Sequence, residues 1–307
     1  MVFLYYIKIF HKIVNYKMKK KLYIYIQNLL PKLLITKFFS YISKKKLSII
    51  TTFFIFLFIK IYKINMKETK YPNIFYYKTF NKFFIRKLNM NNRPIDNNKH
   101  HIIQNTDGII NQLGIIKKNK LFQFKGCEYS LYDLLGQNNN INKIFTNGYF
   151  INIYLSPKNY HRIHMSYNGF LLKMIYIPGK LFPVNNIFSE NLCNLFILNE
   201  RVIFLFKTSF GFMVKILIGA QIVGNIYNSW SGLVISSRRN KIKTWNWPYI
   251  KNFYKKDSIF LKKGEEMGYF NLGSTVITLF PPKTIKFNPV LKKGLNIKIG
   301  ELLAYII

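Results

Sequence analysis

The chain has 307 residues, half of them apolar, and carries 47 Lys and Arg against 11 Asp and Glu. This apolar content suffices for a substantial core in one large or two small domains, which excludes a disordered basic tail. The formal charge of +36 is typical of proteins that bind nucleic acid or an anionic membrane, but the lysines are spread among many Ile, Asn, Phe and Tyr residues, so compositional drift explains the charge more simply.

Residues 1 to 66 form an N-terminal region with two predicted basic, apolar helices. We interpret residues 1 to 17 as an irregular extension, with Met18 as an alternative start. The helices are expected in Leu22 to Tyr41 and in the uncharged run Leu47 to Ile59. The second would measure about 20 Å, too short for the roughly 30 Å of hydrocarbon in a bilayer. We therefore expect interfacial, membrane-binding helices, with ordinary packing on the domain as the alternative.

Residues 67 to 307 show short runs of Ile, Val, Phe and Tyr separated by Gly, Asn and Pro. This pattern predicts a mainly antiparallel β catalytic domain, so the expected fold class is α+β. Gln137 to Asn142 is expected to be a loop and Arg238 to Asp257 an exposed excursion. Neither a P-loop nor a dinucleotide-binding glycine motif is present. The predicted strands are Gly148 to Leu155, Val202 to Phe206, Phe212 to Ile218, Gly232 to Ser236 and Thr275 to Phe280.

Few cysteines and histidines are available for chemistry. Cys127 and Cys193 fit no zinc spacing, which favours two ordinary thiols in a reducing compartment. His161 and His164 follow a predicted strand and could share a metal, but no third ligand lies near them, so we expect no metal site. Acid–base roles and simple surface positions stay open for both. Asp107, before Gly108, is most simply read as part of a turn.

The dipeptide Gly273-Ser274 precedes the apolar run that ends at Phe280. A serine hydroxyl can attack the preceding glycine carbonyl through a five-membered ring, convert the amide into an ester and eliminate to leave a pyruvoyl group. Such a serine needs a base, which a histidine can supply, and a carboxylate can orient that histidine. Local spacing does not show whether the three residue types meet in space.

Blocks of sequence from about Leu29 to the C terminus resemble the bacterial phosphatidylserine decarboxylase proenzymes. Their number and fixed order make the resemblance specific. Asn105 and Ser166 depart from it, because the family commonly has proline at both places, which alters loop stiffness rather than chemistry. The blocks are Phe83 to Arg86, Arg93 to Asp96, Thr106 to Gly108, Lys125-Gly126, Tyr129 to Leu131, Tyr154 to Pro157, Tyr160 to Met165, Gly179 to Asn185, Asn199 to Val202, Val223-Gly224, Lys263 to Gly268 and Leu272 to Thr275.

The resemblance implies autocatalytic cleavage between Gly273 and Ser274, giving a β chain (1–273) and an α chain (274–307) that form a heterodimer, with further dimerisation left open. Asp107, His164 and Ser274 correspond to the self-processing triad, and Ser274 becomes the covalent pyruvoyl cofactor. This group would form an imine with phosphatidylserine, release CO₂ and yield phosphatidylethanolamine for phospholipid biosynthesis. His161 is linked to decarboxylation; we expect it to donate or relay a proton, since a near-neutral pKa suits transfer.

The expected partners are phosphatidylserine and an anionic membrane surface, with the protein peripheral on the cytoplasmic side of the cell membrane. Nucleic acid is not expected, because no helix-turn-helix, RRM or zinc module is recognisable. Two alternatives remain: a basic nucleic-acid-binding protein, and a structural membrane protein that kept the fold but lost self-processing.

Overall fold

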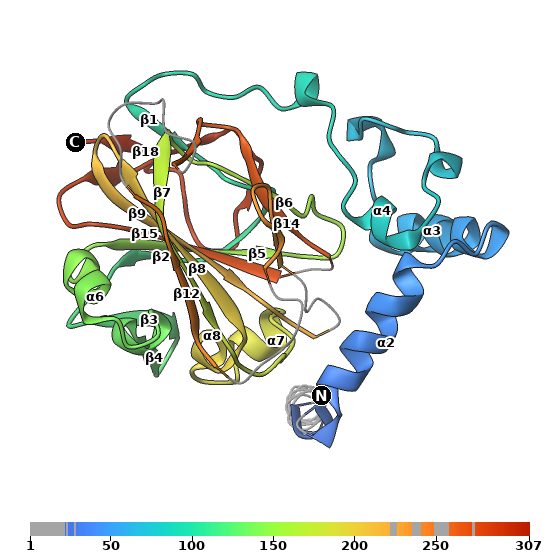
Figure 1. Cartoon of the computed structure of the whole chain (residues 1–307), viewed down its shortest axis with the longest axis horizontal. Helices are drawn as coiled ribbons and strands as arrows, with labels where there is room; N and C mark the ends of the chain where they lie inside the picture. Colours follow the sequence, from blue (N-terminus) through green and yellow to red (C-terminus); the bar gives the residue numbers. More distant parts are fainter. Residues whose placement is uncertain are drawn as a thin grey trace, which may run out of the picture.

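The computed structural model describes residues 22, 24–27, 29–221, 226–234, 241–248, 258–271 and 274–307. The expected extension of residues 1 to 17, Met18 and Gly273 lie outside these ranges, whereas Ser274 lies within them. The described chain is α+β, and its paired strands are antiparallel throughout the named sheets, as predicted. Figure 1 shows the blue and teal helices α2 (Lys32–Lys44), α3 (Ile49–Tyr62) and α4 (Phe80–Phe84) to one side of the sheets.

Two helices occupy the predicted apolar runs: α2 spans Lys32–Lys44 and α3 spans Ile49–Tyr62. They contact a short helix, α4 (Phe80–Phe84), which begins where the Thr79 hydroxyl accepts a hydrogen bond from the Lys82 N–H. Three 3₁₀ turns complete this region: η1 (Met66–Glu68), η2 (Ile74–Tyr76) and η3 (Met90–Asn92). Within the described ranges, no helix has the length and apolarity needed to cross a membrane.

Helix α3 buries one face and exposes the other. Its buried Ile55 packs in a cluster with Tyr77 and Phe83 from the segment that follows the helix. On the other face Ile49 is 82% exposed and Phe53 is 60% exposed. Most of the large apolar side chains that the described chain exposes lie between residues 22 and 76. This region therefore presents an apolar surface that the described chain does not cover.

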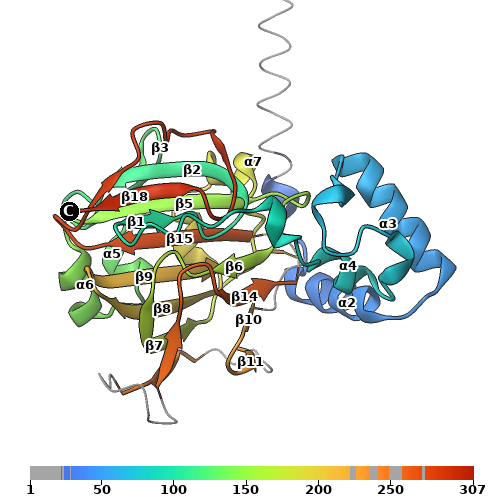
Figure 2. The same ribbon diagram turned by 90° about the horizontal axis from the view of Figure 1, so that it is seen from above.

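The β domain is built on a nine-stranded sheet in which β15 is a central strand with every residue buried. Its β-branched and aromatic residues suit a strand flanked by neighbours on both edges, and Figure 2 shows it among the stacked strands beside the helices. The strands, in sheet order, are β12 (Lys243–Asn246), β7 (Gly169–Ile177), β8 (Arg201–Thr208), β9 (Gly211–Ile218), β15 (Ser274–Phe280), β5 (Tyr149–Leu155), β2 (Gly108–Ile115) and β17 (Asn296–Ile297), with β13 (Ile259–Leu261) on β7.

Smaller sheets and short helices cover the large sheet. In Figure 1, β1 (His101–Ile103) and β18 (Leu302–Ile306) are drawn at the upper left beside β9 and β7, β6 (Arg162–His164) and β14 (Glu266–Phe270) to the right of them, and the labelled short helices towards the bottom. One small sheet has the order β11 (Gly232–Leu233), β10 (Ile226–Asn228), β14 (Glu266–Phe270), β6 (Arg162–His164); another has β1 (His101–Ile103), β18 (Leu302–Ile306), β16 (Ile285–Phe287); β3 (Lys120–Phe124) pairs with β4 (Cys127–Ser130). The helices are α5 (Leu131–Leu134), α6 (Asn139–Phe145), α7 (Asn186–Ser189) and α8 (Leu195–Leu198).

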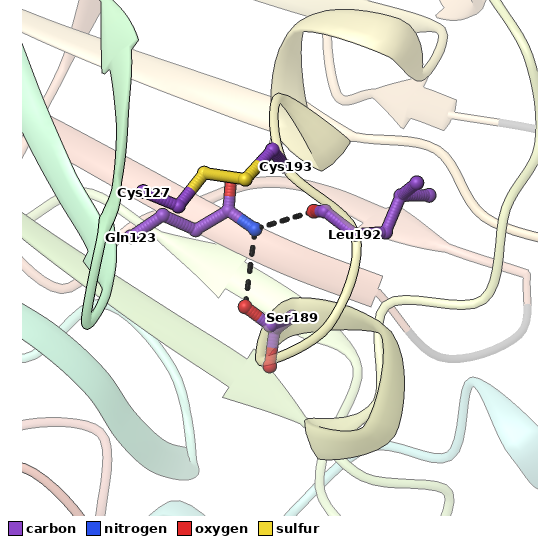
Figure 3. The surroundings of a disulfide bond; sticks show 5 residues. All are labelled: Gln123, Cys127, Ser189, Leu192 and Cys193. Atoms are coloured by element: carbon purple, nitrogen blue, oxygen red, sulfur yellow. Dashed lines mark hydrogen bonds between the residues drawn. A yellow bond between two sulfur atoms is a disulfide. The ribbon is translucent and has the colours of Figure 1, made fainter. Parts of the chain in front are cut away.

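The cysteine prediction was wrong, because Cys127 and Cys193 form a disulfide (Figure 3). Cys127 begins β4 and Cys193 follows α7, 66 residues later. The side-chain amide of Gln123 holds the two segments together by donating to the carbonyls of Ser189 (3.0 Å) and Leu192 (2.7 Å). Sequence spacing does not reveal this pairing, since it depends on how β3, β4 and α7 pack.

Two other local predictions need correction. The expected loop Gln137 to Asn142 contains the start of α6, where the Asn138 side chain accepts from the Ile141 N–H and caps the helix. The expected excursion Arg238 to Asp257 contains β12, which pairs with β7 and packs Trp245 against the core; residues 235–240 and 249–257 lie outside the described ranges.

Candidate active site

Ser274 is the first residue of β15 and lies opposite Leu155 of β5. Its side chain is completely buried, and its hydroxyl has no hydrogen-bond partner among the residues that the structure describes. Gly273, the other half of the predicted cleavage site, lies outside the described residues. The paired strands thus place the candidate nucleophile at a defined position inside the domain.

His164 ends β6 and is held at both ring nitrogens. Its Nδ1 lies 2.8 Å from the carbonyl oxygen of Gly264, so Nδ1 carries the proton in this hydrogen bond. The hydroxyl of Tyr160 lies 2.9 Å from Nε2 and can donate to it. Burial lowers the pKa of His164, although the Gly264 carbonyl opposes the shift. This geometry supports a neutral imidazole with Nε2 as its basic nitrogen.

Asp107 directly precedes β2, and its carboxylate is fully engaged. Oδ1 accepts the backbone N–H of Ile299 at 2.9 Å, and Oδ2 pairs with Arg93 at 3.1 Å. This network goes beyond the simple turn that the sequence suggested. The segment that contains Asp107 lies beside β6, because the His164 N–H donates to the Asn105 carbonyl at 2.8 Å. Its charge favours the protonated form of His164, yet no hydrogen bond joins the two side chains in this structure.

His161 is completely buried and lies against Phe84, with ring centroids 4.2 Å apart. Neither ring nitrogen makes a hydrogen bond of good geometry. Burial, and next the nearby Arg86 charge, lower the pKa of His161 to about 3, while the backbone of Asn159 opposes this shift. The near-neutral pKa expected from the sequence is therefore not what this environment produces, and the ring is neutral at pH 7.

The sheets bring three of the four predicted residues into one region. His164 ends β6, His161 directly precedes it, and Asp107 lies two residues after Asn105, whose carbonyl accepts the His164 N–H. The Phe270 N–H of neighbouring β14 donates to the His161 carbonyl at 3.1 Å. Ser274 follows β14 closely in the chain, but its hydroxyl bonds to neither histidine in this structure. Within the described ranges, no group of three His, Cys, Asp or Glu residues could hold a metal ion.

Sequence reasoning gave no role to Tyr160, Arg86 or Arg93. Tyr160 contacts His164, Arg93 contacts Asp107, and Arg86 influences His161. All three lie in blocks that carry the family resemblance. Their position in these blocks was the only indication in the sequence that they lie near the site. Their contacts depend on the tertiary structure.

An apolar cavity of about 750 Å³ lies between α2, α3 and the β domain. We call it the helix cavity. Its walls include Phe58 of α3, Phe84 and Leu155. Phe84 packs on His161 and Leu155 pairs with Ser274, so this cavity reaches the layer of residues next to the site. An apolar molecule held there would lie beside both residues.

The chain is similar to proteins of one known enzyme family. The family model for phosphatidylserine decarboxylase matches residues 80–305. The phosphatidylserine decarboxylase proenzymes of Escherichia coli O45:K1 and of Klebsiella pneumoniae subsp. pneumoniae are each 46% identical to this chain over 279 residues. Each alignment covers 91% of this chain and 86% of the relative. The chain therefore belongs to the phosphatidylserine decarboxylase family, the enzyme identity that its sequence blocks indicated.

Proposed function

We propose that this chain cleaves itself between Gly273 and Ser274 and then decarboxylates phosphatidylserine to phosphatidylethanolamine at a membrane surface. The observation that carries the proposal is the Ser274 hydroxyl at the head of β15, which is buried and has no hydrogen-bond partner in the described part of the chain. A buried hydroxyl that makes no hydrogen bond costs folding free energy. An unpartnered Ser274 hydroxyl is therefore better explained by a role in the reaction than by a role in the stability of β15.

In the self-processing step the Ser274 Oγ adds to the Gly273 carbonyl carbon, and the amide nitrogen leaves as an amine to give an ester. His164 supports this step as the base, because its Nε2 is the unprotonated nitrogen. Tyr160 already engages Nε2, so the proton path from Ser274 runs through the Tyr160 hydroxyl or requires that bond to open. Asp107 supports the charged imidazole electrostatically.

The surroundings of Ser274 suit a pyruvoyl group at this position. The buried side chains of Asn271 and Thr275, close to Ser274 in the chain, have unpartnered polar atoms that could donate to its carbonyl oxygens. Such a group supplies a ketone that accepts the electrons released when CO₂ leaves. His161 would deliver a proton to the carbon that lost CO₂. A substrate carboxylate beside His161 would raise its pKa and make the protonated ring accessible.

The lipid substrate is supported by the two apolar features of the N-terminal region. The helix cavity offers apolar walls for acyl chains next to the site. The exposed apolar side chains of α2 and α3, with lysines at their ends, suit an anionic leaflet. We propose peripheral association with the cytoplasmic side of the cell membrane.

Cleavage would leave two chains that stay associated without a covalent link. The α chain, residues 274 to 307, contains β15, which pairs with β5 and β9 of the β chain. Breaking these ladders would expose a fully buried strand. We expect the two fragments to separate only under denaturing conditions.

The decisive experiment replaces the nucleophile. Ser274→Ala should give one uncleaved band and release no CO₂ from phosphatidylserine vesicles, whereas Ser209→Ala, at an exposed serine, should be cleaved and active. Fragment masses and CO₂ release measure the two steps. A cleaved doublet from Ser274→Ala would refute the cleavage site.

His161 is tested separately from processing. His161→Ala should still yield the two fragments but lose decarboxylation, because the proposed role of His161 begins after cleavage. Cleavage together with decarboxylation at the parent rate would show that His161 does not handle the proton.

A further inference from the structure

A second cavity, of about 260 Å³, borders Asp107 and Tyr160. We call it the cationic cavity, because its walls carry five cationic side chains and only two carboxylates. Lys63, Lys158 and Lys298 are exposed at its mouth, whereas Arg86 and Arg93 are buried in its wall. This combination of an open cationic mouth and buried guanidinium groups is suited to an entering anion.

The two buried arginines differ in how their charge is compensated. Arg93 forms ion pairs with Glu68 and Asp107, the two carboxylates of the cavity wall. Arg86 is 5% exposed, and no described carboxylate forms an ion pair with it. Its Nη2 donates to the Lys158 carbonyl at 2.9 Å, but Nε and Nη1 have no hydrogen-bond partner within the described ranges. A buried charge with unsatisfied donors is costly unless something else compensates it.

Arg201 shows how the same domain satisfies a buried arginine that has a structural role. It is 2% exposed, and its guanidinium donates to the carbonyls of Asp133, Leu134, Ile197 and Asn199. Arg86 makes one such hydrogen bond, to the Lys158 carbonyl, and its Cζ lies 5.3 Å from the centroid of the Phe83 ring. The difference indicates that Arg86 is kept for a ligand rather than for the packing of the domain.

We propose that the cationic cavity binds the phosphodiester of the phosphatidylserine headgroup, with Arg86 as its principal ligand. This inference rests on the proposed function. The cavity shares a wall with the site, since Tyr160 lines it and also contacts His164 Nε2. In the substrate the phosphorus lies only a few bonds from the reacting serine amine, so a lipid at Ser274 must place its phosphate nearby.

The phosphate fits this cavity better than the substrate carboxylate does. The phosphodiester keeps its charge throughout the reaction, so a guanidinium that binds it holds the ground state and transition state alike. The carboxylate loses its charge as CO₂ leaves, and a strong ion pair to it would stabilise the substrate against reaction. The carboxylate is better placed near the apolar pair of His161 and Phe84.

Binding can be measured without any catalysis. In full-length Ser274→Ala protein we expect glycerophosphoserine to bind, and inorganic phosphate to compete with it, in calorimetric titrations. Adding Arg86→Gln should weaken both affinities about ten- to hundredfold, because hydrogen bonds to a charged group are lost. Lys120→Gln, at an exposed lysine of β3 outside the cavity, is the matched control and should bind as the parent does. Unchanged affinity in Arg86→Gln, or phosphate that binds without competing, would overturn the assignment.

Thermal unfolding separates a ligand role from a structural one. Without ligand, Arg86→Met should melt at or above the parent, because it removes a buried charge that forms no ion pair with a described carboxylate. Arg201→Met should melt lower, because four backbone carbonyls lose their donor. Phosphate should raise the melting temperature of the parent and of Arg201→Met but not of Arg86→Met. Equal destabilisation by the two methionine variants would make Arg86 structural and refute the proposal.

Kinetics on the cleaved protein tests the phosphate site separately from the proposed reaction. Arg86→Gln should raise KM for phosphatidylserine about ten- to hundredfold and should change kcat less than KM, because the guanidinium binds the phosphate in substrate and transition state alike, whereas its charge reaches His161 only electrostatically. Decarboxylation with an unchanged KM in this variant would refute the phosphate site alone. Arg86-dependent binding in a chain that neither cleaves itself nor decarboxylates would refute the proposed function and leave the site standing.

Discussion

The N-terminal helices and the large sheet use similar apolar residues in opposite ways. Phe204 of β8 is completely buried, whereas Phe53 of α3 is 60% exposed. The sheet covers its aromatic side chains with strands, short helices and smaller sheets of the same chain. Helix α3 has such cover on one face only, from the segment around Tyr77 and Phe83. Apolar residue types therefore do not by themselves define a core, because their burial depends on what packs against them.

Replacing one aromatic in each region should give the largest contrast. Phe204→Ala should lower the free energy of unfolding by about 3–5 kcal/mol, because it leaves a cavity in a closed core. Phe53→Ala should change it by less than about 0.5 kcal/mol, because this side chain is exposed. Urea unfolding of the detergent-free protein measures both. Similar losses would show that α3 is covered in solution.

Acid should destabilise the β domain rather than the helices, since α2 and α3 contain no Asp, Glu or His. The folded pKa of His161 is about 3, against an ordinary value of 6.5, so the unfolded chain takes up this proton first. The contribution of neutral, buried His161 to the free energy of unfolding is therefore complete above pH 6.5 and is lost as the pH falls towards 3. His161→Phe should flatten the fall in unfolding midpoint over this range, and His100→Gln, at an exposed histidine, should not. An identical pH profile in His161→Phe would show that its burial is not what acid disrupts.

Charge on the exposed face of α3 should separate membrane binding from folding. Phe53→Asp should weaken partition into phosphatidylserine-containing vesicles at least about tenfold, since a buried Phe contributes roughly 1.5–3 kcal/mol, and should leave the melting temperature nearly unchanged. Phe122→Asp, at an exposed aromatic of the β domain, is the matched control and should bind as the parent does. Vesicle sedimentation measures the partition. If the two variants bind equally, the docking surface lies elsewhere.

The smallest expected effect comes from single lysines near the helices. Lys46→Gln, between α2 and α3, should weaken binding to anionic vesicles about fivefold, since one lysine contributes about 1 kcal/mol at such a surface. The effect should disappear on neutral vesicles and at high salt. Lys120→Gln serves as the control on the β domain. A loss that salt does not screen would contradict an electrostatic role for Lys46.

Much of the β domain was predictable because its strands are locally distinctive. The run from Thr275 to Phe280 is rich in β-branched and aromatic residues, and it forms β15 with one added residue. Local sequence patterns did not predict the structure where one side-chain interaction determined it. Asn138 turned an apparent Asn-rich loop into the start of α6 by capping it. The Cys127–Cys193 disulfide joins segments whose proximity depends on packing.

The sequence by itself determined the family, the apolar helices, the antiparallel strands and the identity of Asp107, His161, His164 and Ser274 as candidates. These depend on residue types and order along the chain, which local propensity and motif blocks record. Only the tertiary structure decided the surroundings of those residues: Tyr160 on His164, Arg93 on Asp107, the apolar burial of His161, and Arg86 without an ion pair to any described carboxylate. Hydrogen bonding, burial and charge compensation are properties of three-dimensional neighbours, and these neighbours come from strands far apart in the sequence.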